Sequence, residues 1–259
     1  GGAGGAAAHA RKDHRFLLDS AGKASVFLEP AAVDAGGALR PNVSRRRAVR
    51  KVAHGLHRLP GPFRDFVLSP RMGGLARALG WRKPAAVQTL YRLAPAGAAG
   101  VERHQDSTTL YTEPPSVLGL WLALEDADEA NGCLRIRRGS HREPIRERLV
   151  REGCGPQPGA ESDGCVPQLV FKRLVNTTAE PDEAFTPMKT RAGDLLVMHG
   201  ALEHFSESGW DPRRTRESVQ THVVEGSARW APDNWLQYPP GVPFDRLPVP
   251  PEPPVFSEL

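Results

Sequence analysis

Hydrophobic and polar positions follow a period of two along several short segments, which is the pattern of β-strands. Apolar and polar residues alternate over 85–93, as in a half-buried strand. The segment 116–124 (SVLGLWLAL) is nearly all apolar, as in a strand that is buried on both faces. The same reasoning predicts strands at 133–137, 194–199 and 218–224.

Helical periods occur only in the first third of the chain. Ser44 is a candidate N-cap, and the spacing of apolar residues after it predicts a helix over 44–56 with a basic polar face. A second helix is expected after Ser69, where Pro70 suits the first helical position, and it should end near Gly80. The segment 16–28 is expected to form a β-hairpin.

Short helices followed by many strands predict a mainly β fold, a sandwich or barrel with helices packed on its outside. We expect one domain over 15–238, preceded by a flexible tail at 1–14 and followed by a Pro-rich tail at 239–259. The segment 143–190 has little periodicity and many turn residues, so we expect a long excursion from the core there.

Composition changes this picture little. The 26 glycines and 25 prolines of the 259 residues favour turns and short strands. The net charge of +4 is too small to predict a nucleic-acid partner, and the basic run at 45–51 fits a solvated helix face. No apolar run is long enough for a membrane span, so no membrane partner is expected.

The three cysteines are an odd number without close spacing, which predicts neither a disulfide framework nor a zinc ribbon. No signal-peptide pattern is visible, so the cytoplasm is the expected location. Import into an organelle stays open, because the chain has no initiator Met and its N-terminus looks incomplete. We expect a monomer.

The candidate chemistry begins with His104 and Asp106. On an extended segment, residues i and i+2 point to the same face, so an imidazole nitrogen and a carboxylate oxygen can meet at one metal ion. A second histidine would complete the two-His-one-carboxylate triad of non-haem Fe(II) oxygenases. His199, at the end of a predicted strand, and His204 are both candidates. His141 with Glu143 is a rival pair at the same spacing.

Further histidines and arginines surround these candidates. His54, His57 and His222 have no carboxylate at ligand spacing and are interpreted as packing residues. An arginine-rich stretch, which includes Arg216, leads into the strand at 218–224. A guanidinium there can hold a carboxylate through two parallel hydrogen bonds, as a 2-oxo acid that chelates iron with its other end would need.

The sequence resembles the phytanoyl-CoA dioxygenase family of Fe(II)- and 2-oxoglutarate-dependent oxygenases, and within it the branch of phytanoyl-CoA dioxygenase domain-containing proteins. The similar stretches span 50–237. They are RKVAHGLH (50–57), AAVQTLY (85–91), HQDSTTLYTEPPSVLGLWLALEDADEANGCL (104–134), GSH (139–141), GDLLVMHGALEH (193–204) and WAPDNWLQ (230–237).

The resemblance implies a double-stranded β-helix, or jelly roll, with flanking N-terminal helices and a metal near one mouth. His104 and Asp106 match the first two metal ligands of the family. The family pattern of His-x-Ser followed by Arg then fits His204, Ser206 and Arg216, if one inserted residue is assumed, so the resemblance favours His204 over His199 as the third ligand.

The same resemblance implies a function and a cosubstrate site. The chain is expected to hydroxylate a C–H bond of an unidentified small-molecule or acyl substrate, using Fe(II), 2-oxoglutarate and O2 and releasing succinate and CO2. Its catalytic residues are expected to be His104, Asp106, His204 and Arg216. Contacts to 2-oxoglutarate are implied, besides the metal ligands, for Lys51, Leu90, Trp121, Ser206 and Arg216.

Two alternatives stay open at this stage. The same fold can hold iron and 2-oxoglutarate without productive hydroxylation, as a sensory module, and the ligands would then persist. A nucleic-acid-binding domain that uses the basic run at 45–51 would show an affinity that falls steeply with salt. The carboxylate of Asp106 argues against a halogenase activity, because the related halogenases need that metal position open for halide.

Overall fold

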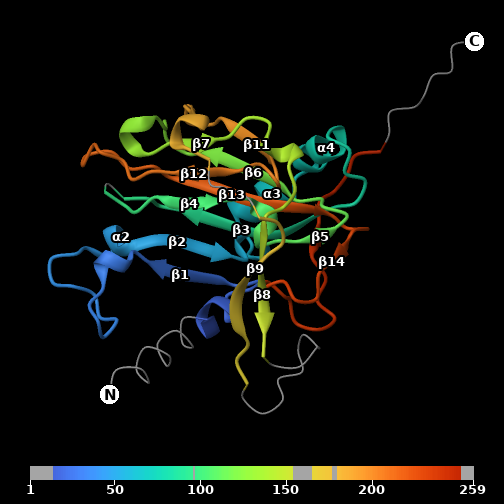
Figure 1. The fold of residues 1–259 in the computed structure, drawn as a ribbon, viewed down its shortest axis with the longest axis horizontal. Helices are drawn as coiled ribbons and strands as arrows, with labels where there is room; N and C mark the ends of the chain where they lie inside the picture. The colour runs from blue at the N-terminus through green and yellow to red at the C-terminus, as the bar shows by residue number, and fades with distance from the viewer. Residues whose placement is uncertain (1–13, 96, 154–164, 177–179, 252–259) are drawn as a thin grey trace, which may run out of the picture.

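The structure is a computed structural model that describes residues 14–95, 97–153, 165–176 and 180–251. It is built mainly from two antiparallel sheets that pack against each other (Figure 1). A cluster of buried side chains between the two sheets includes Trp121 and Met198 from the larger sheet and Leu134 from the smaller one. The predicted mainly β architecture is therefore confirmed.

The larger sheet has seven strands within the described residues. In spatial order these are β1 (Ala24–Leu28), β2 (Val49–His54), β3 (Pro84–Arg92), β13 (Ser218–Glu225), β6 (Leu118–Ala123) and β11 (Leu195–His199), while β15 (Asp245–Arg246) pairs with β3. The strands predicted around β3, β6, β11 and β13 are confirmed. Along β6, Leu118 and Leu120 pack on one side of the sheet and Trp121 on the other, as its apolar run predicts.

The smaller sheet carries the predicted strand at 133–137. Its order is β10 (Thr186–Met188), β7 (Leu134–Ile136), β12 (His204–Ser206) and β4 (Val101–His104). Two further ladders join β5 (Thr112–Glu113) to β14 (Arg229–Trp230), and β8 (Glu147–Glu152) to β9 (Gln168–Arg173). Short 3-10 helices connect many of these strands: η1 (Pro30–Ala32), η2 (Leu56–Arg58), η3 (Asp106–Thr108), η4 (Glu129–Asn131), η5 (Ser140–Arg142) and η6 (Asp182–Ala184).

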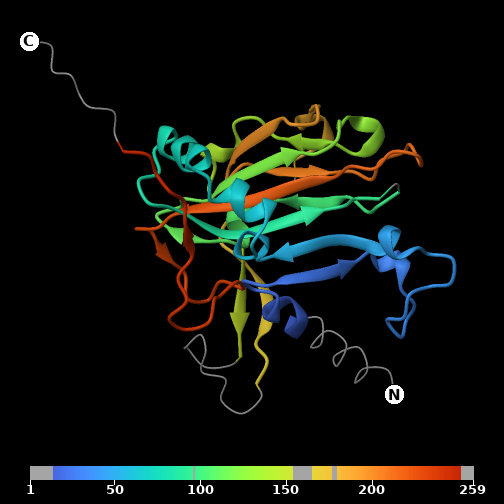
Figure 2. The ribbon, with the colours of Figure 1, turned by 180° about the vertical axis from the view of Figure 1, so that it is seen from behind.

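Helices α3 (Pro62–Val67) and α4 (Pro70–Ala78) cover the outer face of the larger sheet, as Figure 2 shows from behind. The predicted start of α4 is confirmed, because the Ser69 side chain accepts a hydrogen bond from the Met72 amide. Gly80, with a φ of 104°, follows the end of α4 in the left-handed region that glycine tolerates best.

The helix predicted over 44–56 is wrong beyond its first turn. Ser44 caps α2 (Arg45–Ala48), but the chain then continues as β2, which pairs with β1 on one side and β3 on the other. The β-branched Val49 and Val52 suit this strand, and the partners that select it lie far away in sequence. The hairpin predicted over 16–28 is also wrong: residues 14–19 are helical, and β1 pairs with β2 instead.

The described parts of the segment 143–190 contain more regular structure than the sequence predicted. It contains the β8–β9 hairpin, which projects away from the sheets in Figure 1, and strand β10. Leu149 and Leu169 of the hairpin pack against a buried cluster around Trp235, so these strands contribute to the core. Within the Pro-rich segment 239–259, β15 joins the larger sheet and Leu247 is buried. The predicted domain boundaries stay a prediction.

Two other features bear on the sequence predictions. Cys133 is buried with a free thiol, whereas Cys165 is disulfide-bonded, which the cysteine count did not predict; Cys154 lies outside the described residues. No helix within the described parts of the chain combines the length and the apolar character that crossing a bilayer requires.

Candidate metal centre

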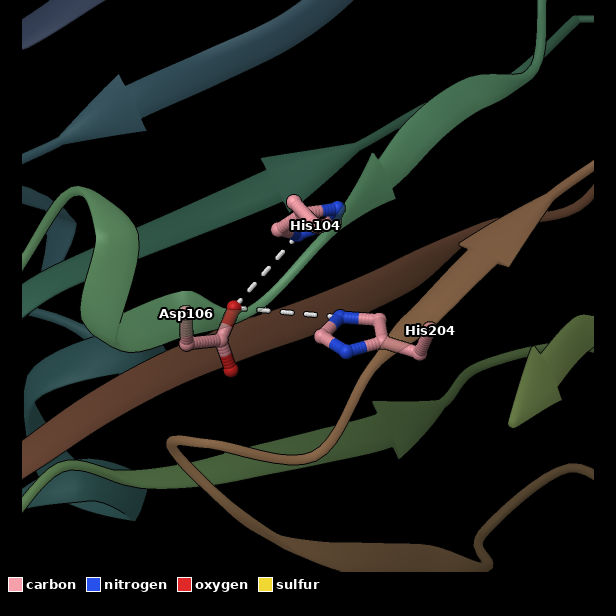
Figure 3. A group of neighbouring side chains, drawn as sticks. All are labelled: His104, Asp106 and His204. Atoms are coloured by element: carbon pink, nitrogen blue, oxygen red, sulfur yellow. Dashed lines mark ion pairs between the residues drawn. The ribbon is translucent and has the colours of Figure 1, made fainter. Parts of the chain in front are cut away.

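His104 and His204 face each other across two neighbouring strands. The last residue of β4 is His104, the first residue of β12 is His204, and the antiparallel register pairs them. Their ring centroids lie 4.3 Å apart. Asp106 begins η3 directly after β4, and Figure 3 shows both imidazoles turned toward its carboxylate. The Nε2 atoms of His104 and His204 lie 3.5 Å and 3.7 Å from Asp106 Oδ1.

The hydrogen bonds made by the Nδ1 atoms determine the tautomers of His104 and His204. His104 Nδ1 lies 2.8 Å from the carbonyl oxygen of Glu102, and His204 Nδ1 lies 3.0 Å from that of Leu202. A carbonyl oxygen only accepts hydrogen bonds, so each Nδ1 carries a proton and donates it. In the neutral rings both Nε2 lone pairs then point at the space beside Asp106, the usual arrangement of metal-binding histidines.

Burial and charge adjust these three groups in different directions. Burial lowers the pKa of His204 to about 4, which keeps its ring neutral. Burial alone would raise the pKa of Asp106, but electrostatic interaction with the His222 and His204 imidazoles and hydrogen bonds with His104 and His222 outweigh burial and lower that pKa well below its usual value. Burial also opposes charge on His104, yet the hydrogen bond and charge of Asp106 raise its pKa.

Gln105, between the two ligand candidates, points away from them. Its side-chain amide donates to the carbonyl of Ala201 at 2.9 Å, and its side-chain oxygen accepts from the Arg146 amide at 2.9 Å. These bonds tie the turn after β4 to the loop that leads into His204. The described side chains that can share one ion are His104, Asp106 and His204, with their ligand atoms all within 4.8 Å of one another.

His199 and His141 lie outside this group. His199 ends β11 with its ring 5.8 Å from that of His141, and its Nδ1 accepts a hydrogen bond from the Ala201 amide at 3.1 Å. Both rings line a cavity of ≈ 420 Å³ together with Tyr111 and Ile145. Glu143, the partner in the rival pair, is bound instead by Arg137 and Arg146.

Two of the residues implied as cosubstrate contacts line the inner face of the larger sheet. Leu90 on β3 and Trp121 on β6 both pair with Gln220 of β13, so all three side chains point to the same face. That face is the one occupied by the inter-sheet cluster, to which Trp121 belongs. Leu90 and Trp121 are 8% and 4% exposed, so both lie in the apolar interior.

The other implied contacts are polar: Lys51 and Arg216 lie at one end of this face, and Ser206 contacts Arg216 from β12 of the smaller sheet. Arg216 is 4% exposed, and its Nη2 donates to the Ser206 hydroxyl at 3.3 Å. The Arg216 amide donates to Ala94, which continues the pairing of β13 with β3 beyond Ser218 and Arg92. Lys51 pairs with Arg92 from the other side, with its ammonium 4.7 Å above the Phe27 ring.

These cations have few partners among the described residues. Arg216 Nε and Nη1 and Arg92 Nε are buried without a hydrogen bond. Burial lowers the pKa of both arginines to about 10, and the neighbouring positive charges act in the same direction on Arg92. Burial and the charges of Arg50 and Arg92 likewise lower the pKa of Lys51 to about 8. Lys51, Arg92 and Arg216 form a cation row that is suited to bind an anion.

The sequence interpretation missed Arg92 and His222. Arg92 belongs to the polar set of an alternating strand pattern, which gave no signal that it faces the interior. His222, interpreted as a packing residue, has its Nε2 3.2 Å from Asp106 Oδ2. Lys51 was expected on a wet helix face, but it belongs to β2 and is partly buried on the inner face.

Comparison with known proteins decides the family. The family model described as phytanoyl-CoA dioxygenase (PhyH) matches residues 6–215. The chain belongs to this family. It is 35% identical to "Phytanoyl-CoA dioxygenase 1" of Oryza sativa subsp. japonica over 87% of this chain and 76% of that protein. It is 36% identical to "Phytanoyl-CoA dioxygenase domain-containing protein 1" of Bos taurus over 90% of this chain and 76% of that protein.

Solved structures show the same fold at low sequence identity. EctD from S. alaskensis with bound Fe has a TM-score of 0.54 and 16% identity, and the match covers 94% of this chain and 79% of that one. The carbocyclase SnoK, described as a non-heme alpha-ketoglutarate-dependent enzyme, has a TM-score of 0.51 and 19% identity, with 71% and 68% covered. The predicted double-stranded β-helix is confirmed. The chain therefore has the fold of an oxygenase family whose members act on small molecules with O2.

Proposed function

We propose that this protein is a Fe(II)- and 2-oxoglutarate-dependent dioxygenase that hydroxylates a C–H bond of a small-molecule or acyl substrate and releases succinate and CO2. The observation that carries this proposal is the convergence of His104, Asp106 and His204, with both Nε2 lone pairs directed at one point. Two imidazoles and one carboxylate fit Fe(II) and leave the other coordination positions open. When bound, Fe(II) and the 2-oxo acid together activate O2 for the oxidation.

The protein's own residues would bind and orient the cosubstrate. Arg216, whose Nε and Nη1 are buried without hydrogen bonds among the described residues, would hold the distal carboxylate of 2-oxoglutarate through the parallel N–H groups of Nη1 and Nη2. Ser206, which already accepts from Arg216, would direct its hydroxyl hydrogen to the same carboxylate. Lys51 would add positive charge from the neighbouring strand.

The apolar residues between the two ends would exclude water. Leu90 and Trp121 lie on the inner face between the layer of Gln88 and His222 and the layer of Arg92 and Ser218. An apolar wall strengthens the charge interactions at both ends, because water no longer screens them. We further propose that the partners are O2 and a small molecule and that the protein acts as a monomer.

The test is an anaerobic titration of the purified protein with Fe(II) and 2-oxoglutarate. We expect a visible metal-to-ligand charge-transfer band when both are present, and succinate formation after O2 is admitted. Asp106→Ala should abolish both signals, whereas Asp65→Ala, at an exposed position of α3, should leave them unchanged. Succinate formation at the wild-type rate in Asp106→Ala would refute the proposal.

A further inference from the structure

The carboxylate of Asp106 has a second contact that the metal triad does not explain. Its Oδ1 faces His104 and His204, while its Oδ2 lies 3.2 Å from Nε2 of His222 on β13. The other ring nitrogen, His222 Nδ1, lies 2.9 Å from the side-chain nitrogen of Gln88 on β3. His222 and Gln88 are 3% and 6% exposed, so bulk water does not reach this chain of contacts.

The placement of the His222 proton follows from which atoms can donate. His222 Nε2 and Asp106 Oδ2 lie 3.2 Å apart, and neither atom makes a hydrogen bond to another described residue; because an ionised carboxylate only accepts, this approach is favourable with the proton on Nε2. The Gln88 amide nitrogen can only donate, so His222 Nδ1 accepts from it. His222 is then a neutral ring that contacts Gln88 through Nδ1 and Asp106 through Nε2, so Gln88 determines the orientation of the ring toward Asp106. This tautomer is the opposite of the one found in His104 and His204, so Nε2 of His222 has no lone pair for a metal.

The niche around Asp106 Oδ2 is closed on another side by β6. Gly119 pairs with His222 across the β6–β13 ladder, and a Cβ atom at Gly119 would lie 2.8 Å from Asp106 Oδ2. Since real Cβ atoms do not come that close, a side chain at this position would displace the carboxylate. Gly119 leaves room for Oδ2 of Asp106, and the His222 ring contacts this oxygen. Oδ1 is then directed at the two imidazoles.

We propose that His222, held by Gln88, is a positioning residue that keeps Asp106 Oδ2 in this niche, so that Oδ1 alone is presented to a divalent cation between His104 and His204. This inference rests on the proposed function. Its chemical consequence concerns the open coordination positions. A carboxylate that binds through one oxygen occupies one position, whereas a carboxylate free to rotate can bind through both and take a position that the 2-oxo acid or O2 needs.

The first test uses the metal-free protein. Long-range ¹H–¹⁵N NMR spectra of the histidine rings report which nitrogen carries the proton. We expect His222 as the Nε2–H tautomer, and we expect the Gln88→Leu variant to lose this preference. The Nδ1–H tautomer at His222 in the wild-type protein would overturn the inference, because Nε2 would then have no proton for Asp106.

The second test measures the affinity for Mn²⁺ or Co²⁺ alone, by calorimetry and by the visible absorption of Co²⁺. Removal of a residue that orients a metal ligand typically weakens metal binding by about 10- to 100-fold, so we expect this loss in His222→Leu. His222→Gln, which keeps a nitrogen donor of similar reach, should recover most of it. Thr221→Val is the matched control: it removes a buried hydrogen bond to Thr89 from the same strand, but on the opposite face.

The outcomes separate the two proposals. A wild-type protein that binds no divalent cation would overturn the proposed function. A wild-type protein that binds metal, with equal affinity in His222→Leu, would overturn only the role of His222. An equal loss in His222→Leu and Thr221→Val would also overturn it, because the effect would then reflect general damage to β13. Selective loss in His222→Leu with recovery in His222→Gln supports the inference.

Discussion

Arg216 is a buried cation whose replacement should stabilise the metal-free protein and at the same time impair cosubstrate binding. Burial lowers the pKa of its guanidinium from 12.5 to about 10. Each pKa unit corresponds to about 1.4 kcal/mol, so keeping Arg216 charged in the folded protein costs on the order of 3 kcal/mol. Because the folded-state pKa is lowered, this cost is present in full at neutral pH and is relieved only as the pH rises through about 10.

Arg216→Met removes the charge and keeps an unbranched side chain in the same space. Losing the hydrogen bond to Ser206 destabilises the variant by about 1 kcal/mol. The free energy of unfolding should therefore rise by a net amount of about 2 kcal/mol. For a chain of this size that gain corresponds to a rise of roughly 4–8 °C in Tm. Hydrogen bonds between charged groups contribute about 1.5–3 kcal/mol each, so the affinity for 2-oxoglutarate should fall by at least about 10- to 100-fold.

Thermal unfolding in the presence of a chelator gives the first quantity, and calorimetry with Mn²⁺ and 2-oxoglutarate gives the second. Arg213→Met is the control, because Arg213 has a side chain that is 86% exposed and paired with Asp211 at the surface. Its Tm and its affinity for 2-oxoglutarate should match those of the wild type within error. If Arg216→Met unfolds at a lower temperature than the wild type without ligand, the guanidinium is not an uncompensated charge and the reasoning is refuted.

Three further predictions concern the same candidate site. Gly119→Ala should weaken Mn²⁺ binding by at least about 10-fold without lowering the Tm, since the new methyl group displaces Asp106 while the backbone conformation stays accessible to alanine; unchanged calorimetric affinity would contradict the niche. The affinity for 2-oxoglutarate should fall above about pH 8, because Lys51, whose pKa is lowered to about 8, then loses its charge; Lys51→Met should remove this pH dependence. Mn²⁺ affinity should fall as the pH is lowered, beginning above the ordinary histidine pKa of about 6.5, because the hydrogen bond and charge of Asp106 raise the pKa of His104 and a proton then competes for its Nε2; an affinity that stays constant as the pH is lowered through that value would count against His104 as a ligand.

The sequence was informative where spacing along one segment decides the geometry. His104 and Asp106 are two residues apart at the end of a strand, and the structure brings their ligand atoms together. The inward positions of Leu90 and Trp121 did not follow from the strand patterns, because the alternation over β3 grouped Leu90 with the polar Gln88 and Arg92 and the apolar run of β6 did not distinguish its two faces. His204 could be chosen over His199 only through the family pattern, since both follow the same predicted strand.

Contacts between distant segments were beyond the reach of such patterns. His222 has no carboxylate near it in sequence, and its partner Asp106 lies in η3, after strand β4 of the other sheet. Lys51 was placed on a helix because the apolar spacing after Ser44 fits a period of 3.6. The pairing of β2 with β1 and β3 overrides that local preference, and such pairing depends on segments that local periodicity does not weigh.

The register between β3 and β13 links the metal centre to the cation row. Three residues of β3 point inward. Gln88 supports Asp106 through His222, Leu90 lies in the apolar part of the proposed cosubstrate site, and Arg92 belongs to the cation row. The register shifts once, between His222 and Val223, so that Ala86 turns outward to pack with Val223 against the helices while Gln88 stays inward. A slip of one residue would exchange the two faces of β3. It would turn Gln88, Leu90 and Arg92 away from the cavity together, so one strand alignment determines both ends of the proposed cosubstrate site.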